Sequence, residues 1–344
     1  HTGVGLLQGS MGIDTAYRQG VPMVVVSGES LTYSEKEDFE PGPQWHGVLS
    51  VVGGPSALVD GITKWSQSVS SPHTLHEQLI RAGEMAQRSP AGPVYMSVPI
   101  ETMLHDWTPP KNPRAVPSAS RPVPPTADIE AVADMLLAAN NPAIVAESIG
   151  RDPAGYSATV ELADLLAIPV SECRWIDFTN FPKDHPLYQG MGEPEYLHDC
   201  DVVLTLRARA PWTPPSAKPA NAKIVNIDET PFRPHMVHQS LQADVFLEGD
   251  AVATLQSLIA VLRKKGIDDA AGIAAQHQGQ GKLVTRHAAP HPRDAGDAAG
   301  VGHWRRGQRR VHGLLHSDRA QERDGVRRRH APRPRSTPAL RARA

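Results

Sequence analysis

The chain has 344 residues, a length that predicts two domains, each long enough to bury its own core. Its formal net charge of −2 is nearly neutral, its two cysteines form no C-x-x-C pair, and no apolar run approaches about 18 residues. We therefore expect a soluble protein of the reducing cytoplasm, with no disulfide framework, zinc site or membrane span.

The first hundred residues alternate between helical and strand patterns. The expected elements are a glycine-rich turn at residues 1–5, a helix from about 6 to 19, strands at 21–27, 61–69 and 94–98, and a helix from 72 to 88 that Ser71 caps. Strands that are apolar on both faces are typical of parallel sheets covered by helices. The pattern predicts an α/β domain that ends near residue 106.

A second α/β domain is expected at residues 126–266, after a connector at 107–125 that contains seven prolines and should be extended and stiff. Its predicted helices are 127–139 with Thr126 as cap, 156–166, and 251–264 with Asp250 as cap; its predicted strands are 143–146, 168–171, 202–206 and 223–227. Short strands with helical crossovers predict an open, doubly wound parallel sheet.

Residues 267–344 differ in character from the rest of the chain. From residue 283 onwards there are 15 arginines against 5 acidic residues, and too few apolar residues to offset the entropy of ordering, so we expect a disordered tail. This stretch lacks Lys, Ile, Phe, Tyr and Met, which is typical of a GC-rich gene translated in the wrong frame. The alternative is a genuine arginine-rich arm that binds nucleic acid through its phosphates, although only Trp304 could stack on a base.

Two candidate ligand contacts lie in the first domain. The backbone of Gly3 and Gly5, before a helix, could receive an anion, but no strand precedes them as a dinucleotide fingerprint requires, and a simple tight turn is the alternative. Glu29, next to Gly28, follows a strand at the end where parallel sheets bind ligands, and could act as an acid or base. A solvated loop residue is the alternative interpretation of Glu29.

The second domain has three polar or glycine-bearing strand ends, at residues 147–150, 190–192 and 228–229. An acidic residue such as Asp228 after a parallel strand can hold a ribose hydroxyl, which makes a nucleotide a candidate ligand; a structural loop is the alternative. No H-E-x-x-H, G-x-S-x-G or phosphate-loop motif occurs, so zinc peptidases, serine hydrolases of the elbow type and P-loop enzymes are excluded.

The order of several short motifs resembles the thiamine diphosphate enzymes of the acetolactate synthase and 2-oxo acid decarboxylase superfamily, including benzoylformate decarboxylase. In the pyrimidine-binding domain of that family, a glycine-rich turn, a G-I-x-x-A-Y helix and a P-x-V-V-x-x-G strand follow one another, as residues 3–5, 12–17 and 22–28 do here. Residues 92–99 are similar to its G-P-V strand, and residues 127–262 to its Rossmann-like central domain. The resemblance implies a partial pyrimidine-binding domain, a Rossmann-like central domain and an unrelated tail.

The resemblance also implies an activity. Such enzymes bind thiamine diphosphate and Mg²⁺ between subunits and act on 2-oxo acids as lyases or transferases, by decarboxylation or acetolactate-type condensation. The intact parent is expected to be a homodimer or homotetramer. The activating glutamate is expected before residue 1, and the Gly-Asp-Gly and Asn of the diphosphate domain are not found after residue 266. We therefore expect a truncated, frameshifted fragment that is inactive alone.

Individual residues follow from the resemblance. His1 occupies the place at which some decarboxylases have a proton-relaying histidine, with a frayed terminus as the alternative, and Gly3, Gly5, Gly28 and Glu29 are expected on the thiamine diphosphate side.

Flavin and nucleic acid are the remaining candidate ligands. FAD, which acetolactate synthases hold in the central domain, would be contacted by Gly190, Gly192 and Asp228, but altered segments at 147–150 and 206–209 argue against it. The competing hypothesis for the whole chain is a nucleotide-binding module with an arginine-rich nucleic-acid arm; nucleic acid is the less favoured partner.

Overall fold

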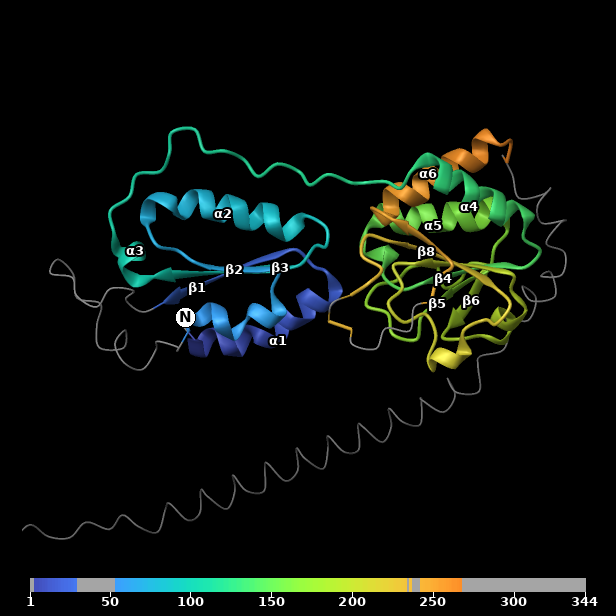
Figure 1. Cartoon of the computed structure of the whole chain (residues 1–344), viewed down its shortest axis with the longest axis horizontal. Helices are drawn as coiled ribbons and strands as arrows, with labels where there is room; N and C mark the ends of the chain where they lie inside the picture. The colour runs from blue at the N-terminus through green and yellow to red at the C-terminus, as the bar shows by residue number, and fades with distance from the viewer. Residues whose placement is uncertain (1–2, 30–52, 234, 237–241, 268–344) are drawn as a thin grey trace, which may run out of the picture. The chain divides into compact units, whose positions relative to one another are not determined.

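The computed structural model describes residues 3–29, 53–233, 235–236 and 242–267 (Figure 1). His1 and the predicted tail from residue 268 onwards lie outside the described residues. No helix within the described ranges is long and apolar enough to cross a membrane.

The first part of the chain forms a parallel three-stranded sheet in the order β1-β3-β2. The strands are β1 (Met23–Glu29), β2 (Trp65–Ser68) and β3 (Pro93–Pro99). Helices α1 (Gly3–Gln19) and α2 (Pro72–Gln87) lie on opposite faces of this sheet, and the short α3 (Ile100–Leu104) follows β3 (Figure 1). On the α1 side Leu6 and Ile13 pack with Tyr95, and on the α2 side Ala82 packs with Met96. The predicted α/β arrangement is confirmed.

Three local expectations in this part can be compared with the structure. The predicted glycine-rich turn is wrong for its described residues: Gly3 and Gly5 belong to α1. Leu6, in the same helical turn, packs with Tyr95, and this packing outweighs the low helix propensity of glycine. The strand expected at 61–69 begins only at Trp65, because the 3₁₀-helix η3 (Asp60–Ile62) occupies its first residues. The Ser71 cap is confirmed, since its Oγ accepts the N–H of His73 at 3.2 Å.

The second part contains a six-stranded parallel sheet in the order β6-β5-β4-β7-β8-β9. Its strands are β4 (Pro142–Ala146), β5 (Val170–Glu172), β6 (Tyr188–Met191), β7 (Val202–Leu206), β8 (Lys223–Asp228) and β9 (Val245–Glu248). Numbered within this domain the order is 3-2-1-4-5-6, the arrangement of doubly wound folds, whose strand order reverses between the first and fourth strands. The reversal here lies between β4 and β7, which are hydrogen-bonded neighbours.

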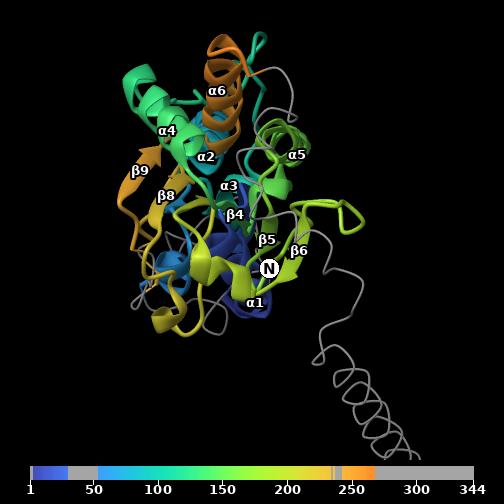
Figure 2. The same cartoon turned by 90° about the vertical axis from the view of Figure 1, so that its right-hand side faces the viewer.

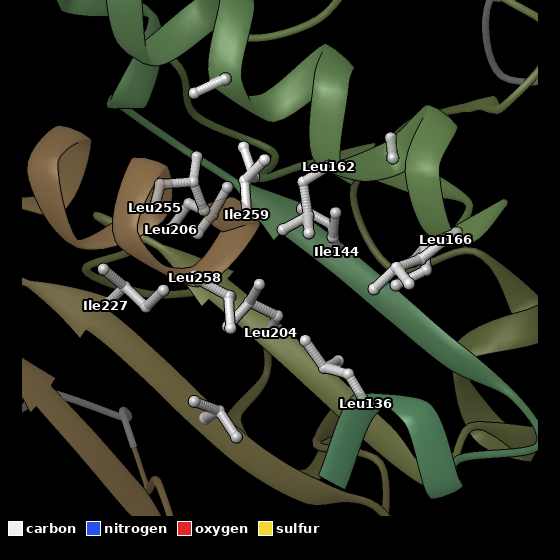
Figure 3. Packing of buried hydrophobic residues seen from close by; sticks show 14 of the residues in the cluster. Leu136, Ile144, Leu162, Leu166, Leu204, Leu206, Ile227, Leu255, Leu258 and Ile259 are labelled. Atoms are coloured by element: carbon white, nitrogen blue, oxygen red, sulfur yellow. The ribbon is translucent and has the colours of Figure 1, made fainter. Parts of the chain in front are cut away.

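The two faces of this sheet are covered differently. Helices α4 (Thr126–Ala138), α5 (Pro153–Leu166) and α6 (Ala251–Lys264) gather on one face (Figures 1 and 2), while short 3₁₀-helices and loops around the fully buried Trp212 cover the other. Figure 3 shows Leu136 of α4, Leu204 of β7 and Leu258 of α6 meeting in the larger core. Each such leucine contributes about 1.5–3 kcal/mol by leaving water. The core therefore holds the strand ends at fixed positions.

Helix starts in the second part follow local capping chemistry. Asp250 Oδ1 accepts the N–H of Ala253 at 2.8 Å, which confirms the predicted cap of α6. Thr126 is not a cap but the first residue of α4, because Pro125 occupies the N-cap position with an extended backbone. α5 begins earlier than predicted, since Asp152 caps it and Pro153 suits its first turn. The two edge strands, β6 and β9, were not among the predicted strands.

The proline-rich connector has no helix or strand and is largely exposed, as expected. It is anchored to α2, because Arg114 pairs with Glu84 and Gln87 donates Nε2 to the carbonyl oxygen of Pro117 at 3.0 Å. The connector is therefore extended, and these contacts hold it against α2.

Candidate functional site

Buried polar groups gather at the carboxyl edge of the first sheet. Glu29 ends β1 and is only 7% exposed, so the solvated-loop interpretation is wrong. Two residues earlier on the same strand, Ser27 Oγ lies 2.7 Å from the hydroxyl of Tyr95 on β3. The pKa of Tyr95 is raised, first by burial and then by the nearby charge of Glu29, against the lowering effect of Ser27. This edge thus combines a carboxylate with hydroxyl groups in a dry environment.

Sequence reasoning missed a second carboxylate at this edge. Glu101 lies in α3, directly after β3, and is buried. Because β1 and β3 are paired in register from Met23 with Pro93 to Glu29 with Pro99, the two carboxylates follow adjacent strand ends. The sequence did contain one indication of this site: Glu101 lies two positions after the end of an apolar strand, where α/β sheets often place their ligand-binding residues.

The carboxyl ends of β4, β7 and β8 carry three arginine–carboxylate pairs. Arg207 donates Nε to Glu229 at 2.9 Å and also pairs through Nη2. Arg233 Nη2 contacts both carboxylate oxygens of Asp228, at 2.8 and 3.0 Å. The third pair joins Arg209 to Glu147. Side chains from three strand ends therefore meet and neutralise one another.

The segment 147–150 is a closed structural loop. Glu147 is 3% exposed and accepts the backbone N–H of Arg209 at 2.6 Å. The N–H of Gly150 donates to Asn180 Oδ1 at 2.9 Å, and a Cβ at this position would lie 2.0 Å from the carbonyl oxygen of Thr179. Glycine is needed here because another backbone approaches closely, and the structural-loop alternative is favoured.

The predicted nucleotide contacts do not converge. Asp228 is 1% exposed, and besides Arg233 it accepts the N–H of Thr230 at 2.9 Å. Gly190 and Gly192 have φ values of +94° and +87° at the end of β6. Three strands separate β6 from β8, which places these sites roughly 19 Å apart at the usual strand spacing. A single small ligand would not reach both.

A cavity of about 770 Å³ lies at the carboxyl edge of the second sheet. Its lining includes Arg18, Arg121, Arg151, Arg207, Arg209 and Arg233. Arg151, which sequence reasoning missed, donates Nη1 at 2.9 Å to the carbonyl oxygens of Gln19 and of Gly20. Burial, and then the positive charge of Arg207, lower the pKa of Arg151. In the sequence, only its position directly after the strand-end segment 147–150 indicated that Arg151 could belong to a site.

Among the residues that the structure describes, no three His, Cys, Asp or Glu side chains lie where they could hold a metal ion together.

Comparison with known proteins shows which proteins the chain is similar to. Residues 129–258 match the model of the thiamine pyrophosphate enzyme central domain. The chain is 27% identical over 307 residues to a probable 2-ketoarginine decarboxylase of Pseudomonas aeruginosa, covering 83% of this chain and 50% of the relative. A probable acetolactate synthase large subunit of Methanocaldococcus jannaschii is 24% identical, with 75% of this chain and 44% of the relative covered.

A solved structure gives the same picture. Benzoylformate decarboxylase from Polynucleobacter necessarius superposes with a TM-score of 0.61 at 22% identity, over 76% of this chain and 48% of that one. The fold is thus that of thiamine diphosphate enzyme domains, as the sequence predicted. The central part of the chain, residues 129–258, thus matches a domain of thiamine pyrophosphate enzymes, and the similarity to a probable decarboxylase and a probable acetolactate synthase extends over about three quarters or more of the chain. It spans about half the length of the curated relatives it matches.

Proposed function

We propose that this chain supplies the pyrimidine-side and central parts of an enzyme that acts on a 2-oxo acid, by decarboxylation or by acetolactate-type condensation. The observation that carries the proposal is similarity to a decarboxylase over 83% of the chain, which extends beyond the central domain matched at residues 129–258. The family motifs at residues 12–17 and 22–28 support the same assignment for the first sheet.

The residues at the carboxyl edge of the first sheet fit the polar ring of thiamine diphosphate. Glu29 offers a buried carboxylate, and the paired hydroxyls of Ser27 and Tyr95 offer hydrogen-bond partners beside it. When bound, the cofactor supplies an electron sink for cleavage of the bond to the substrate carboxylate. Glu29 and Tyr95 would orient the ring and exclude water, and Gly28, which precedes Glu29 on β1 and is paired with Val98, would lie on the same side of the cofactor.

The activating carboxylate and the diphosphate and Mg²⁺ site belong, in this proposal, to polypeptide that complements the chain. The alternative in which Glu29 itself activates the cofactor is not adopted, because the resemblance aligns Glu29 with the end of the strand that follows the glycine-rich segment. The proposal includes a homodimeric or homotetrameric parent in the cytoplasm, with His1 relaying protons to the substrate.

FAD fits the central domain poorly. Asp228, the residue expected to hold a ribose, is engaged by Arg233 and Thr230, and the loop at Gly150 is closed by Asn180. The strand ends accordingly give no support to a nucleotide-binding module as the function of the chain.

Turnover measurements test the proposed function. The purified chain with thiamine diphosphate and Mg²⁺ should release no CO₂ from pyruvate, benzoylformate or a guanidino 2-oxo acid. A chimera in which residues 1–266 replace the matching region of benzoylformate decarboxylase should release CO₂ from at least one of them. The proposal is wrong if the chimera folds and binds thiamine diphosphate, but turns over none of these acids while the unaltered decarboxylase does.

A further inference from the structure

The arginine-lined cavity has no role in the proposed function. We propose that it binds a small oxyanion carrying two negative charges, inorganic phosphate or a phosphomonoester, between Arg151 and Arg207. The inference does not depend on thiamine diphosphate chemistry, so it can fail or hold separately.

Arg207 provides the first argument. Its side chain is 6% exposed and lines the cavity, and two of its nitrogens pair with Glu229. The third, Nη1, is buried and has no hydrogen-bond partner in the described part of the chain. A buried guanidinium N–H left without an acceptor is costly, so natural structures usually supply one. An anion oxygen in the cavity would be that acceptor.

The backbone at Arg207 supports the same conclusion. Its φ of +47° lies in the left-handed region, which residues with a side chain rarely adopt. Such conformations persist where the surrounding structure imposes them, and they often occur at binding sites. Here the conformation comes directly after β7, beside the point where the strand order reverses.

Arg151 provides the second positive charge. It forms no ion pair with a carboxylate among the residues that the structure describes, and its known contacts are the two neutral carbonyl oxygens of Gln19 and Gly20. The other lining arginines pair with acids: Arg209 with Asp177 at 3.2 Å, for example. The cavity therefore retains an excess of positive charge next to Arg207, and an anion would offset it.

The same geometry disfavours a larger nucleotide. Asp228 does not line the cavity, and its carboxylate is bound by Arg233. Glu229, which does line it, is bound by Arg207 and lies 3.4 Å from the N–H of Ala251. Neither of the two carboxylates at the end of β8, Asp228 and Glu229, is therefore available to hold a ribose. The guanidinium groups of Arg151 and Arg207 instead suit a compact dianion.

Anion titrations of the whole purified chain test the proposal. Inorganic phosphate, phenyl phosphate and FAD would each be titrated by calorimetry at constant ionic strength, with KCl as the reference salt. We expect phosphate to bind with a 1:1 ratio, and phenyl phosphate to bind more tightly if the natural ligand is a monoester. The proposal would be overturned if FAD bound more tightly than phosphate and displaced it. It would also be overturned if titration with KCl gave the same heat of binding as titration with phosphate.

Three variants localise the site. Arg207→Asn keeps a residue that tolerates the left-handed backbone, and Arg151→Gln keeps a donor for the Gln19 carbonyl but loses the charge. Each should weaken phosphate binding about tenfold or more, the usual effect of losing a charged hydrogen bond. The control Arg263→Gln removes an arginine that pairs with Glu161 on the exposed side of α6, and should bind normally. Unchanged phosphate affinity in either Arg151→Gln or Arg207→Asn, if that variant retains its circular dichroism, would overturn the proposal.

Discussion

Arg209 contacts two carboxylates of very different burial, which allows the energetic role of the strand-end pairs to be measured. Glu147 is 3% exposed and binds both the side chain and the backbone N–H of Arg209, whereas Asp177 is 35% exposed and contacts only Nη2 at 3.2 Å. Breaking a buried pair typically costs about 3–5 kcal/mol, and an exposed pair contributes about 0.2–1 kcal/mol. Glu147→Gln retains one acceptor oxygen, so we expect a loss near the lower value, about 3 kcal/mol. Asp177→Asn should cost less than about 1 kcal/mol.

Urea unfolding of the two variants, followed by circular dichroism at pH 7, gives both free energies. The double variant Glu147→Gln/Arg209→Gln should cost less than the sum of its single variants, because removing both partners leaves no buried charge uncompensated. The reasoning is refuted if Asp177→Asn destabilises the chain as much as Glu147→Gln does. It is equally refuted if the double variant is strictly additive.

Three further predictions concern the core, acid stability and the cysteines. Leu204→Ala, at a fully buried position, should lower the free energy of unfolding by about 2–5 kcal/mol, whereas Leu104→Ala, at an exposed position, should change it by less than about 0.5 kcal/mol in the same urea assay. Burial alone would raise the pKa of Glu229, but its pair with Arg207 prevails and holds that pKa below the usual 4.5. Its stabilising contribution is therefore present above pH 4.5 and lost as the pH falls further, so Glu229→Gln should flatten the acid limb of a stability–pH profile; an unchanged limb would contradict this. Burial raises the pKa of the Cys200 thiol to about 12 and holds the pKa of the Cys173 thiol well above its usual value, so neither should react with a thiol reagent at pH 8 until the chain is unfolded; rapid labelling of the native chain would show that this burial is wrong.

Much of the fold could be predicted from local patterns. The bounds of α6 and its Asp250 cap follow from apolar spacing and a capping residue that lie within one short stretch of chain. Strand β7 was likewise predicted at its observed bounds, because a buried strand is apolar throughout. β9 was missed because it has only four residues at a sheet edge, where pairing with β8 rather than its own pattern makes it a strand.

The candidate site was predictable only in outline. Sequence reasoning located Glu29 and Asp228 at strand ends, which is where the structure has them. It could not predict that Glu29 is buried beside Tyr95, because the two lie on different strands. The sequence-based contact assignments of Gly28, Glu29, Gly190, Gly192 and Asp228 remain predictions, and so does that of His1.

The sequence by itself determined the succession of helices and parallel strands and the family that they resemble, because helix and strand periodicities and short motifs are properties of neighbouring residues. Only the tertiary structure decided how the charges at the strand ends are used. Glu147 meets Arg209 across 62 positions of chain, and Arg151 reaches carbonyl groups more than 130 positions away. Such partners are selected by the order of strands in the sheet, and no local pattern records that order.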